Sequence, residues 1–153
     1  MPSIDINCDM GESFGPWVMG QDLEILPHVT SANIACGGHA GDEHTMKSTI
    51  EQARRWKLAL GAHPGYPDRP NFGRLELQMP LAAIADSIFE QVTALDKVAA
   101  HCGAGLVHVK PHGALYNVAV HNAEVARAIG RGDGTLSSLR LMTLPSVKPA
   151  ALA

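Results

Sequence analysis

Four short apolar segments of the chain each end in a group of polar side chains, and helical segments separate the last three of them. Apolar and β-branched residues predict strands over residues 4–9, 29–36, 58–63 and 106–110. Apolar residues at helical spacing predict helices over residues 42–57 and 80–101, and a further helix capped by Asn122. This alternation predicts an α/β fold with a parallel sheet and right-handed crossovers.

Polar side chains follow the carboxyl end of every predicted strand. They are Asp9 and Glu12, His39 and Asp42, His63, and finally Lys110 and His112. Ligands bind at the carboxyl ends of the strands in parallel α/β folds. Lys110 ends the last predicted strand, and His112 lies in residues 111–117, which we predict to form a loop because Pro111 has no N–H for the strand ladder. Four such groups at one edge of a sheet predict a shared functional site.

Two kinds of chemistry suit these side chains. The carboxylate of Asp9 and the imidazoles of His39 and His63 suit Zn²⁺ or another first-row divalent cation, with one coordination position left for water. The alternative is acid–base chemistry without a metal, in which His63 or His112 titrates near neutral pH and Asp9 orients one of them. Both alternatives stay open at this point.

Lys110 and three asparagines can bind a substrate. The ammonium group of Lys110, near the end of a buried strand, can hold a carboxylate or an oxyanion of a substrate. Alternatively, it forms an ion pair with Asp9 or Glu12. Asn7, Asn33 and Asn117 carry paired donors and acceptors that can recognise amide groups. The chain has no glycine-rich phosphate-binding loop of the dinucleotide or Walker type.

Composition excludes several functional classes. The net charge of -3 and the lack of a basic stripe argue against nucleic-acid binding. No apolar run approaches the ~20 residues of a membrane span, and the first residues lack the pattern of a signal peptide. Cys8, Cys36 and Cys102 form no Cys-x-x-Cys pair, which favours a reducing, cytoplasmic setting over a disulfide framework.

Four ordered motifs resemble those of the LamB/YcsF family. They are NCDMGES at residues 7–13, SANIACGGHAGD at 31–42, GAHPGYPD at 61–68 and HVKPHGALYN at 108–117, with FGR at 72–74 between the last two. The resemblance covers roughly residues 3–131. It implies an irregular parallel-stranded (β/α) barrel of the glycoside hydrolase and deacetylase type.

The resemblance also implies an activity, which is the ATP-dependent hydrolytic opening of 5-oxo-L-proline (pyroglutamate) to L-glutamate, in complex with 5-oxoprolinase subunits B and C. A lactam is a poor electrophile, so ATP would activate its oxygen before water attacks; which subunit binds ATP stays open. For this reaction we assign catalytic roles to Asp9, His63, Lys110 and His112. We assign substrate binding to Asn7, Glu12, Asn33, Arg74, Tyr116 and Asn117, and a divalent metal, if present, to Asp9, His39 and His63.

The chain departs from the family pattern after Arg131, where the composition changes and no family motif is recognisable. We therefore expect a truncation or frameshift, with residues 1–131 forming a partial barrel of about four strands and residues 132–153 an irregular tail. Four strands cannot close a barrel, so an open sheet edge and uncovered helix faces are expected. Poor solubility or homo-oligomerisation would follow.

Two alternative functions remain beside the ATP-dependent one. The first is a metal-dependent deacetylase or amidohydrolase that uses Asp9, His39 and His63. The second is an inactive, truncated binding module that keeps only ligand affinity or a partner surface. Hydrolysis of ATP that depends on 5-oxoproline, measured with and without the other subunits, separates the three possibilities.

Overall fold

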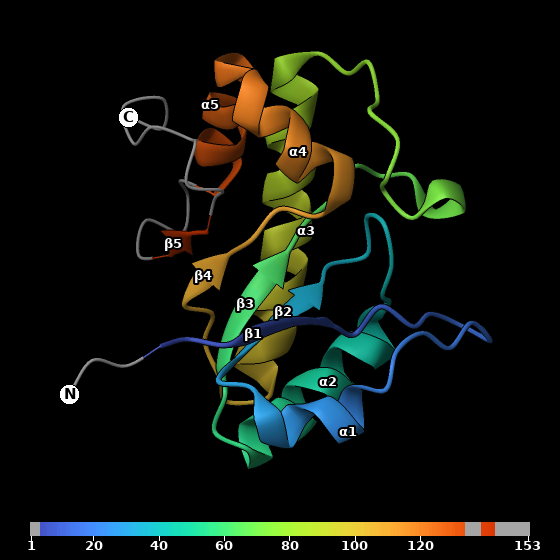
Figure 1. The fold of residues 1–153 in the computed structure, drawn as a ribbon, viewed down its shortest axis with the longest axis vertical. Coiled ribbons are helices and arrows are strands. Elements are labelled where there is room, and N and C mark those ends of the chain that lie inside the picture. Colours follow the sequence, from blue (N-terminus) through green and yellow to red (C-terminus); the bar gives the residue numbers. More distant parts are fainter. Residues whose placement is uncertain (1–3, 134–138, 143–153) are drawn as a thin grey trace.

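Figure 1 shows the computed structural model, which describes residues 4–133 and 139–142. Its sheet has five parallel strands in the order β1-β2-β3-β4-β5. The strands are β1 (Asn7–Met10), β2 (Ser31–Ala35), β3 (Ala59–His63), β4 (His108–Val109) and β5 (Arg140–Leu141). The sheet does not close within the described residues, and β1 and β5 are its edges. The predicted α/β class, an incomplete parallel (β/α) barrel, is confirmed.

Helices connect and cover the strands. They are α1 (Asp22–Ile25), η1 (Leu26–His28), α2 (Glu43–Arg55), η2 (Arg69–Asn71), α3 (Leu81–His101), α4 (Gly113–His121) and α5 (Ala123–Asp133). In Figure 1, α3 crosses behind the sheet and extends above it, and α4 and α5 lie beside the upper half of α3. None of the described helices is both long enough and apolar enough to cross a bilayer.

The two main helices form where the apolar spacing predicts them. The Asp42 side chain accepts the N–H of Thr45 at 2.8 Å, which confirms Asp42 as the N-cap of α2. Along α3, a stripe of residues spaced at three or four positions is buried against the sheet and the neighbouring helices. The stripe consists of Ile84, Ile88, Val92, Leu95 and Ala99.

The strand register separates an apolar row of residues from a polar one. Met10, Ile34, Ala62 and Val109 are aligned across β1 to β4, and all four are completely buried in the core. The neighbouring row consists of Asp9, Asn33, Gly61 and His108. Because successive side chains of a strand point to opposite faces, the polar row occupies the face away from that core. The register therefore brings polar residues from distant parts of the chain together.

Two sequence predictions were wrong in their details. The first strand starts at Asn7, because β2 begins opposite it at Ser31; Ile4 and Ile6 lie before the strand and are exposed. Residues 113–117 were predicted as a loop, but they belong to α4. Apolar residues at helical spacing, which the sequence analysis did not use, pack this helix on the core. They are Ala114, Leu115, Val118 and Ala119.

The predicted irregular tail contributes a strand. α5 continues past Arg131 to Asp133, and Arg140–Leu141 forms β5 on the open side of β4. The N–H of Arg140 donates to the carbonyl of Val107, so this strand satisfies main-chain groups that would otherwise form the sheet edge. Residues 134–138 and 143–153 of the tail lie outside the described part of the chain. Poor solubility of the isolated chain stays a prediction.

A substitution at Gly61 tests how closely the side chain of His108 packs over this strand. A Cβ atom at position 61 would lie 2.0 Å from Nε2 of His108. We expect Gly61→Ala to lower the free energy of unfolding by about 1–3 kcal/mol, since a buried side chain has to move. Gly105→Ala is the matched control, because nothing lies within 4 Å of its added Cβ, and its effect should stay within about 0.5 kcal/mol. Denaturant unfolding measures both, and equal losses would contradict the packing described here.

Candidate functional site

Asp9 joins two predicted catalytic residues. Its Oδ1 accepts from Nζ of Lys110 at 2.6 Å, and its Oδ2 lies 3.4 Å from Nε2 of His63. These residues belong to β1, β3 and the end of β4, so the sheet gathers them as the sequence predicts. Burial opposes ionisation of Asp9, but hydrogen bonds and charge from His63 and hydrogen bonds from Lys110 and Asn33 outweigh it and hold the pKa well below its usual value.

Asn33 links this carboxylate to a residue that the sequence analysis missed. Its side-chain amide donates to Oδ1 of Asn7 and to Oδ1 of Asp9, both at 2.8 Å. Its own Oδ1 accepts from Nε2 of His108 at 2.7 Å, and burial lowers the pKa of His108. The signal was present in the sequence, because His108 and Lys110 alternate onto one face of the last predicted strand.

Four further side chains converge beside Asp9. Glu12, His39, His63 and His112, called the histidine cluster below, each offer one donor atom within 4.8 Å of the others. Nε2 of His39 lies 3.1 Å from Oε1 of Glu12, and Nδ1 of His112 lies 3.6 Å from the same oxygen. The rings of His39 and His112 stack in parallel, with their centroids 3.6 Å apart. All three imidazoles are buried.

Two of these imidazoles have an assigned tautomer. Nδ1 of His63 lies 2.5 Å from the carbonyl oxygen of Lys110, and Nε2 of His112 lies 2.8 Å from that of Phe72. A carbonyl oxygen only accepts, so both nitrogens must carry hydrogen. The opposite nitrogens, Nε2 of His63 and Nδ1 of His112, therefore hold lone pairs when the rings are neutral.

Burial favours the neutral form of two imidazoles of the cluster, His39 and His112. It lowers the pKa of His39, against the opposing effect of the hydrogen bond to Glu12. Burial and the neighbouring imidazoles of His39 and His63 lower the pKa of His112 to about 4. At neutral pH these rings can therefore accept a proton or bind a cation.

The loops around the cluster are fixed by side chains from elsewhere. Arg69 donates to the main-chain carbonyls of Gly37 and Gly41, which holds the loop that carries His39. The amide of Gln91, on α3, bonds both the N–H and the carbonyl of Gly65 in the loop after β3. These contacts hold the cluster in place before any ligand binds.

The other predicted substrate-binding residues lie at different distances from Lys110 and the histidine cluster. Tyr116 lies beside the Lys110 ammonium, 5.9 Å from ring centroid to nitrogen. The exposed Arg74 stacks on Phe72, whose ring edge meets His112. Asn117 is exposed on α4, and none of the described hydrogen bonds connects it to the site.

Asp42 stabilises a loop and does not take part in the candidate site. Besides capping α2, its carboxylate accepts the N–H of Gly15 at 2.9 Å. The N–H groups of Thr45 and Gly15 lower the pKa of Asp42 to about 2. This residue fixes the loop after β1, and no described hydrogen bond connects it to the cluster.

The predicted metal ligands only partly match the converging donors. His39 and His63, two of the predicted ligands, belong to the histidine cluster. The other two members of the cluster are Glu12 and His112, and Asp9 is not one of them. Asp9 is already engaged by Lys110 and Asn33. Its use as a metal ligand stays a prediction.

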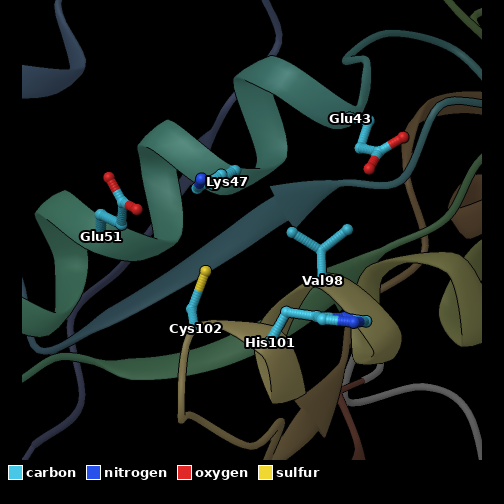
Figure 2. A pocket seen from close by; sticks show the side chains of 6 residues that line it. All are labelled: Glu43, Lys47, Glu51, Val98, His101 and Cys102. Carbon is cyan, nitrogen blue, oxygen red and sulfur yellow. The ribbon is translucent and has the colours of Figure 1, made fainter.

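A surface hollow lies elsewhere, between α2 and the end of α3. Figure 2 shows its lining, which is Glu43, Lys47, Glu51, Val98, His101 and Cys102. None of the predicted site residues is among them. The converging polar groups are therefore found at the strand ends and not in this hollow.

A comparison with protein families identifies the chain. The model of the LamB/YcsF family matches residues 4–153. This chain belongs to the LamB/YcsF family. The match includes the tail, in which the sequence analysis recognised no family motif, and the fifth strand of the sheet lies in that segment.

Relatives of this LamB/YcsF protein carry related names. It is 50% identical over 131 residues to the A subunit of 5-oxoprolinase from Bacillus cereus (strain AH187) and equally to that from Bacillus mycoides (strain KBAB4). The match covers 86% of this chain and 52% of each relative, so the chain spans about half the length of the curated relatives it matches. The solved lactam utilization protein of Thermus thermophilus is 40% identical, with a TM-score of 0.92 over 94% of this chain and 59% of that one.

The buried neutral histidines predict a pH-dependent stability. Because their folded-state pKa values are lowered, only the unfolded chain binds these protons as the pH falls from 6.5 toward 4, so acid favours unfolding. Between pH 5 and 7, where the measurement is made, the carboxylate of Asp9 is ionised in the folded and the unfolded chain and does not contribute to the slope. His108→Gln should reduce the slope by up to about 1.4 kcal/mol per pH unit, the value for one proton. Urea unfolding between pH 5 and 7 measures the slope of the unfolding free energy against pH. The exposed His121→Gln is the control and should leave this slope unchanged. An unchanged slope in His108→Gln would contradict a lowered pKa of His108.

Proposed function

We propose that this chain acts in a 5-oxoprolinase, as the part of its A subunit that carries the site, in the ATP-dependent hydrolytic opening of 5-oxo-L-proline to L-glutamate. The names of its relatives support the choice of a lactam substrate. The observation that carries the proposal is the contact of Asp9 with both Lys110 and His63, at the carboxyl ends of the strands. This contact places a cation, an anion and a proton acceptor side by side.

The Asp9–Lys110 pair is the part of the site that a substrate can reach. The side chain of Asp9 is 37% exposed and that of Lys110 is 20% exposed, whereas the imidazoles beside them are buried. 5-Oxo-L-proline carries a carboxylate and a lactam group. The ammonium of Lys110 suits the carboxylate or the oxyanion that forms at the lactam carbon, and the amides of Asn7 and Asn33 suit the lactam.

His63 would move the proton in this reaction. Its Nε2 lone pair can take a proton from the attacking water, and the carboxylate of Asp9 then stabilises the imidazolium. The N–H at Nδ1 donates to the carbonyl of Lys110, which keeps the ring in the required tautomer. The same proton can return to the ring nitrogen that leaves when the lactam opens. His112, 3.0 Å from His63, extends this relay.

ATP and two partners complete the proposal. Water attacks an unactivated lactam slowly, so ATP would transfer its terminal phosphoryl group to the lactam oxygen before the attack. Breaking the C–N bond would then leave an acyl phosphate, from which a second water would release phosphate to give the carboxylate of glutamate. We propose 5-oxoprolinase subunits B and C as the partners, in a cytoplasmic complex. The relatives are named as one lettered subunit of an enzyme, which supports a complex of several subunits.

Metal-dependent amide hydrolysis without ATP is the second candidate function. The convergence of Glu12 and three imidazoles favours it, because such donors bind hydrolytic metals. The requirement for ATP separates the candidates. Glutamate formation from 5-oxo-L-proline that needs ATP and subunits B and C supports the first, and metal-dependent hydrolysis of an amide without ATP supports the second.

Substitutions in the Asp9–Lys110 pair test the first candidate. Asp9→Asn and Lys110→Met should each lower glutamate formation by the reconstituted complex about 100-fold or more, because one removes the charge beside His63 and the other the oxyanion partner. The exposed Lys97→Met on α3 is the matched control and should keep full activity. Near-normal turnover of either pair variant, measured by glutamate release, removes that residue from the mechanism.

A further inference from the structure

Two ring nitrogens face each other in the histidine cluster. Both rings donate their other N–H to a main-chain carbonyl, so Nε2 of His63 and Nδ1 of His112 are both acceptors whenever the rings are neutral. These two nitrogens are 3.0 Å apart. Two acceptors at this distance repel each other unless a cation lies between them, either a proton or a metal ion.

His39 and Glu12 close the other side of this gap. Nε2 of His39 and Nδ1 of His112 both approach Oε1 of Glu12, at 3.1 and 3.6 Å. Nδ1 of His39 is buried and has no hydrogen-bond partner among the described residues, which is costly. Burying Nδ1 of His39 without a partner destabilises the fold, so we infer that Nε2 of the same ring has a specific partner that offsets this cost.

We propose that Glu12, His39, His63 and His112 bind one divalent first-row transition metal ion of the Zn²⁺ type. Three imidazoles and one carboxylate form a donor set that this class of ion prefers. Ligand bonds of 2.0–2.1 Å in a tetrahedron place donors about 3.3 Å apart, and three of the six donor pairs lie at 3.0, 3.1 and 3.6 Å, with all four donors within 4.8 Å of one another. Because the rings of His39 and His112 stack in parallel, one of them has to turn for both to point a lone pair at the same ion. The site goes beyond the proposed function, and its metal binding does not require that activity.

The surrounding contacts fit a metal site. The N–H of each of two proposed ligands donates to a main-chain carbonyl, from His63 to Lys110 and from His112 to Phe72, and such partners orient metal-bound histidines. Glycine at position 65 leaves room for the third, because a Cβ there would lie 2.8 Å from Nδ1 of His39. Asp9 is not among the residues whose donor atoms converge within 4.8 Å, and Lys110 and Asn33 hold its Oδ1.

Metal binding by the whole chain, without partners or substrate, tests the proposal. The metal-free chain is titrated with Zn²⁺ by calorimetry and with Co²⁺ by visible absorption, and its melting temperature is measured with and without metal. We expect one ion per chain, a Co²⁺ spectrum without thiolate bands, and a rise in melting temperature. Glu12→Gln and His112→Gln should each weaken binding about 10-fold or more, whereas the exposed Glu124→Gln should not change it.

Asp9→Asn distinguishes the proposed ligands from the set predicted from the sequence. If it keeps one ion per chain and weakens binding less than Glu12→Gln does, the proposed set stands. If it loses the ion while Glu12→Gln keeps it, the proposal is overturned in favour of Asp9. No stoichiometric binding by the unsubstituted, folded chain also overturns it, because a proton then fills the gap. Glutamate formation is not measured, so failure of the proposed function would leave this result unaffected.

Discussion

The polar face of the sheet depends on the partly buried contact between Asp9 and Lys110. Taking two charges out of water is costly unless both are well paired. Here Oδ1 of Asp9 accepts from Lys110 at 2.6 Å and from Asn33 at 2.8 Å, and Oδ2 faces His63. The contact ties the first strand to the fourth across a sheet that does not close in the described residues. It also determines which groups remain available to a substrate.

His63 connects two regions of different character. On one side lies the Asp9–Lys110 pair, whose side chains are partly exposed to solvent. On the other lies the histidine cluster, in which the imidazoles are buried and two of them stack. A ring that belongs to both can pass protons between them, or couple a bound cation to the carboxylate of Asp9. The proposed lactam chemistry and the proposed metal site therefore share one residue and remain separately testable.

The sequence predicted the fold class and the gathering of Asp9, His63, Lys110 and His112, because both follow from strands that alternate with helices. It did not predict the grouping of Glu12 with three imidazoles. That grouping depends on loops held by Arg69 and Gln91 and on a left-handed residue at Phe72, and periodicity carries no information about these contacts. The helix at Gly113–His121 was missed because Pro111 and Gly113 were interpreted as the start of a loop. β5 was missed because a two-residue strand has almost no pattern.

Nitrogen-15 NMR of the histidine rings decides what lies between the two facing nitrogens of the cluster. In the metal-free chain we expect hydrogen on Nδ1 of His63 and on Nε2 of His112, because both nitrogens donate to main-chain carbonyls. Added Zn²⁺ should then shift the two facing nitrogens, Nε2 of His63 and Nδ1 of His112. Hydrogen on both nitrogens of either ring, with no change on adding Zn²⁺, would show that a proton holds the cluster together and would contradict the account.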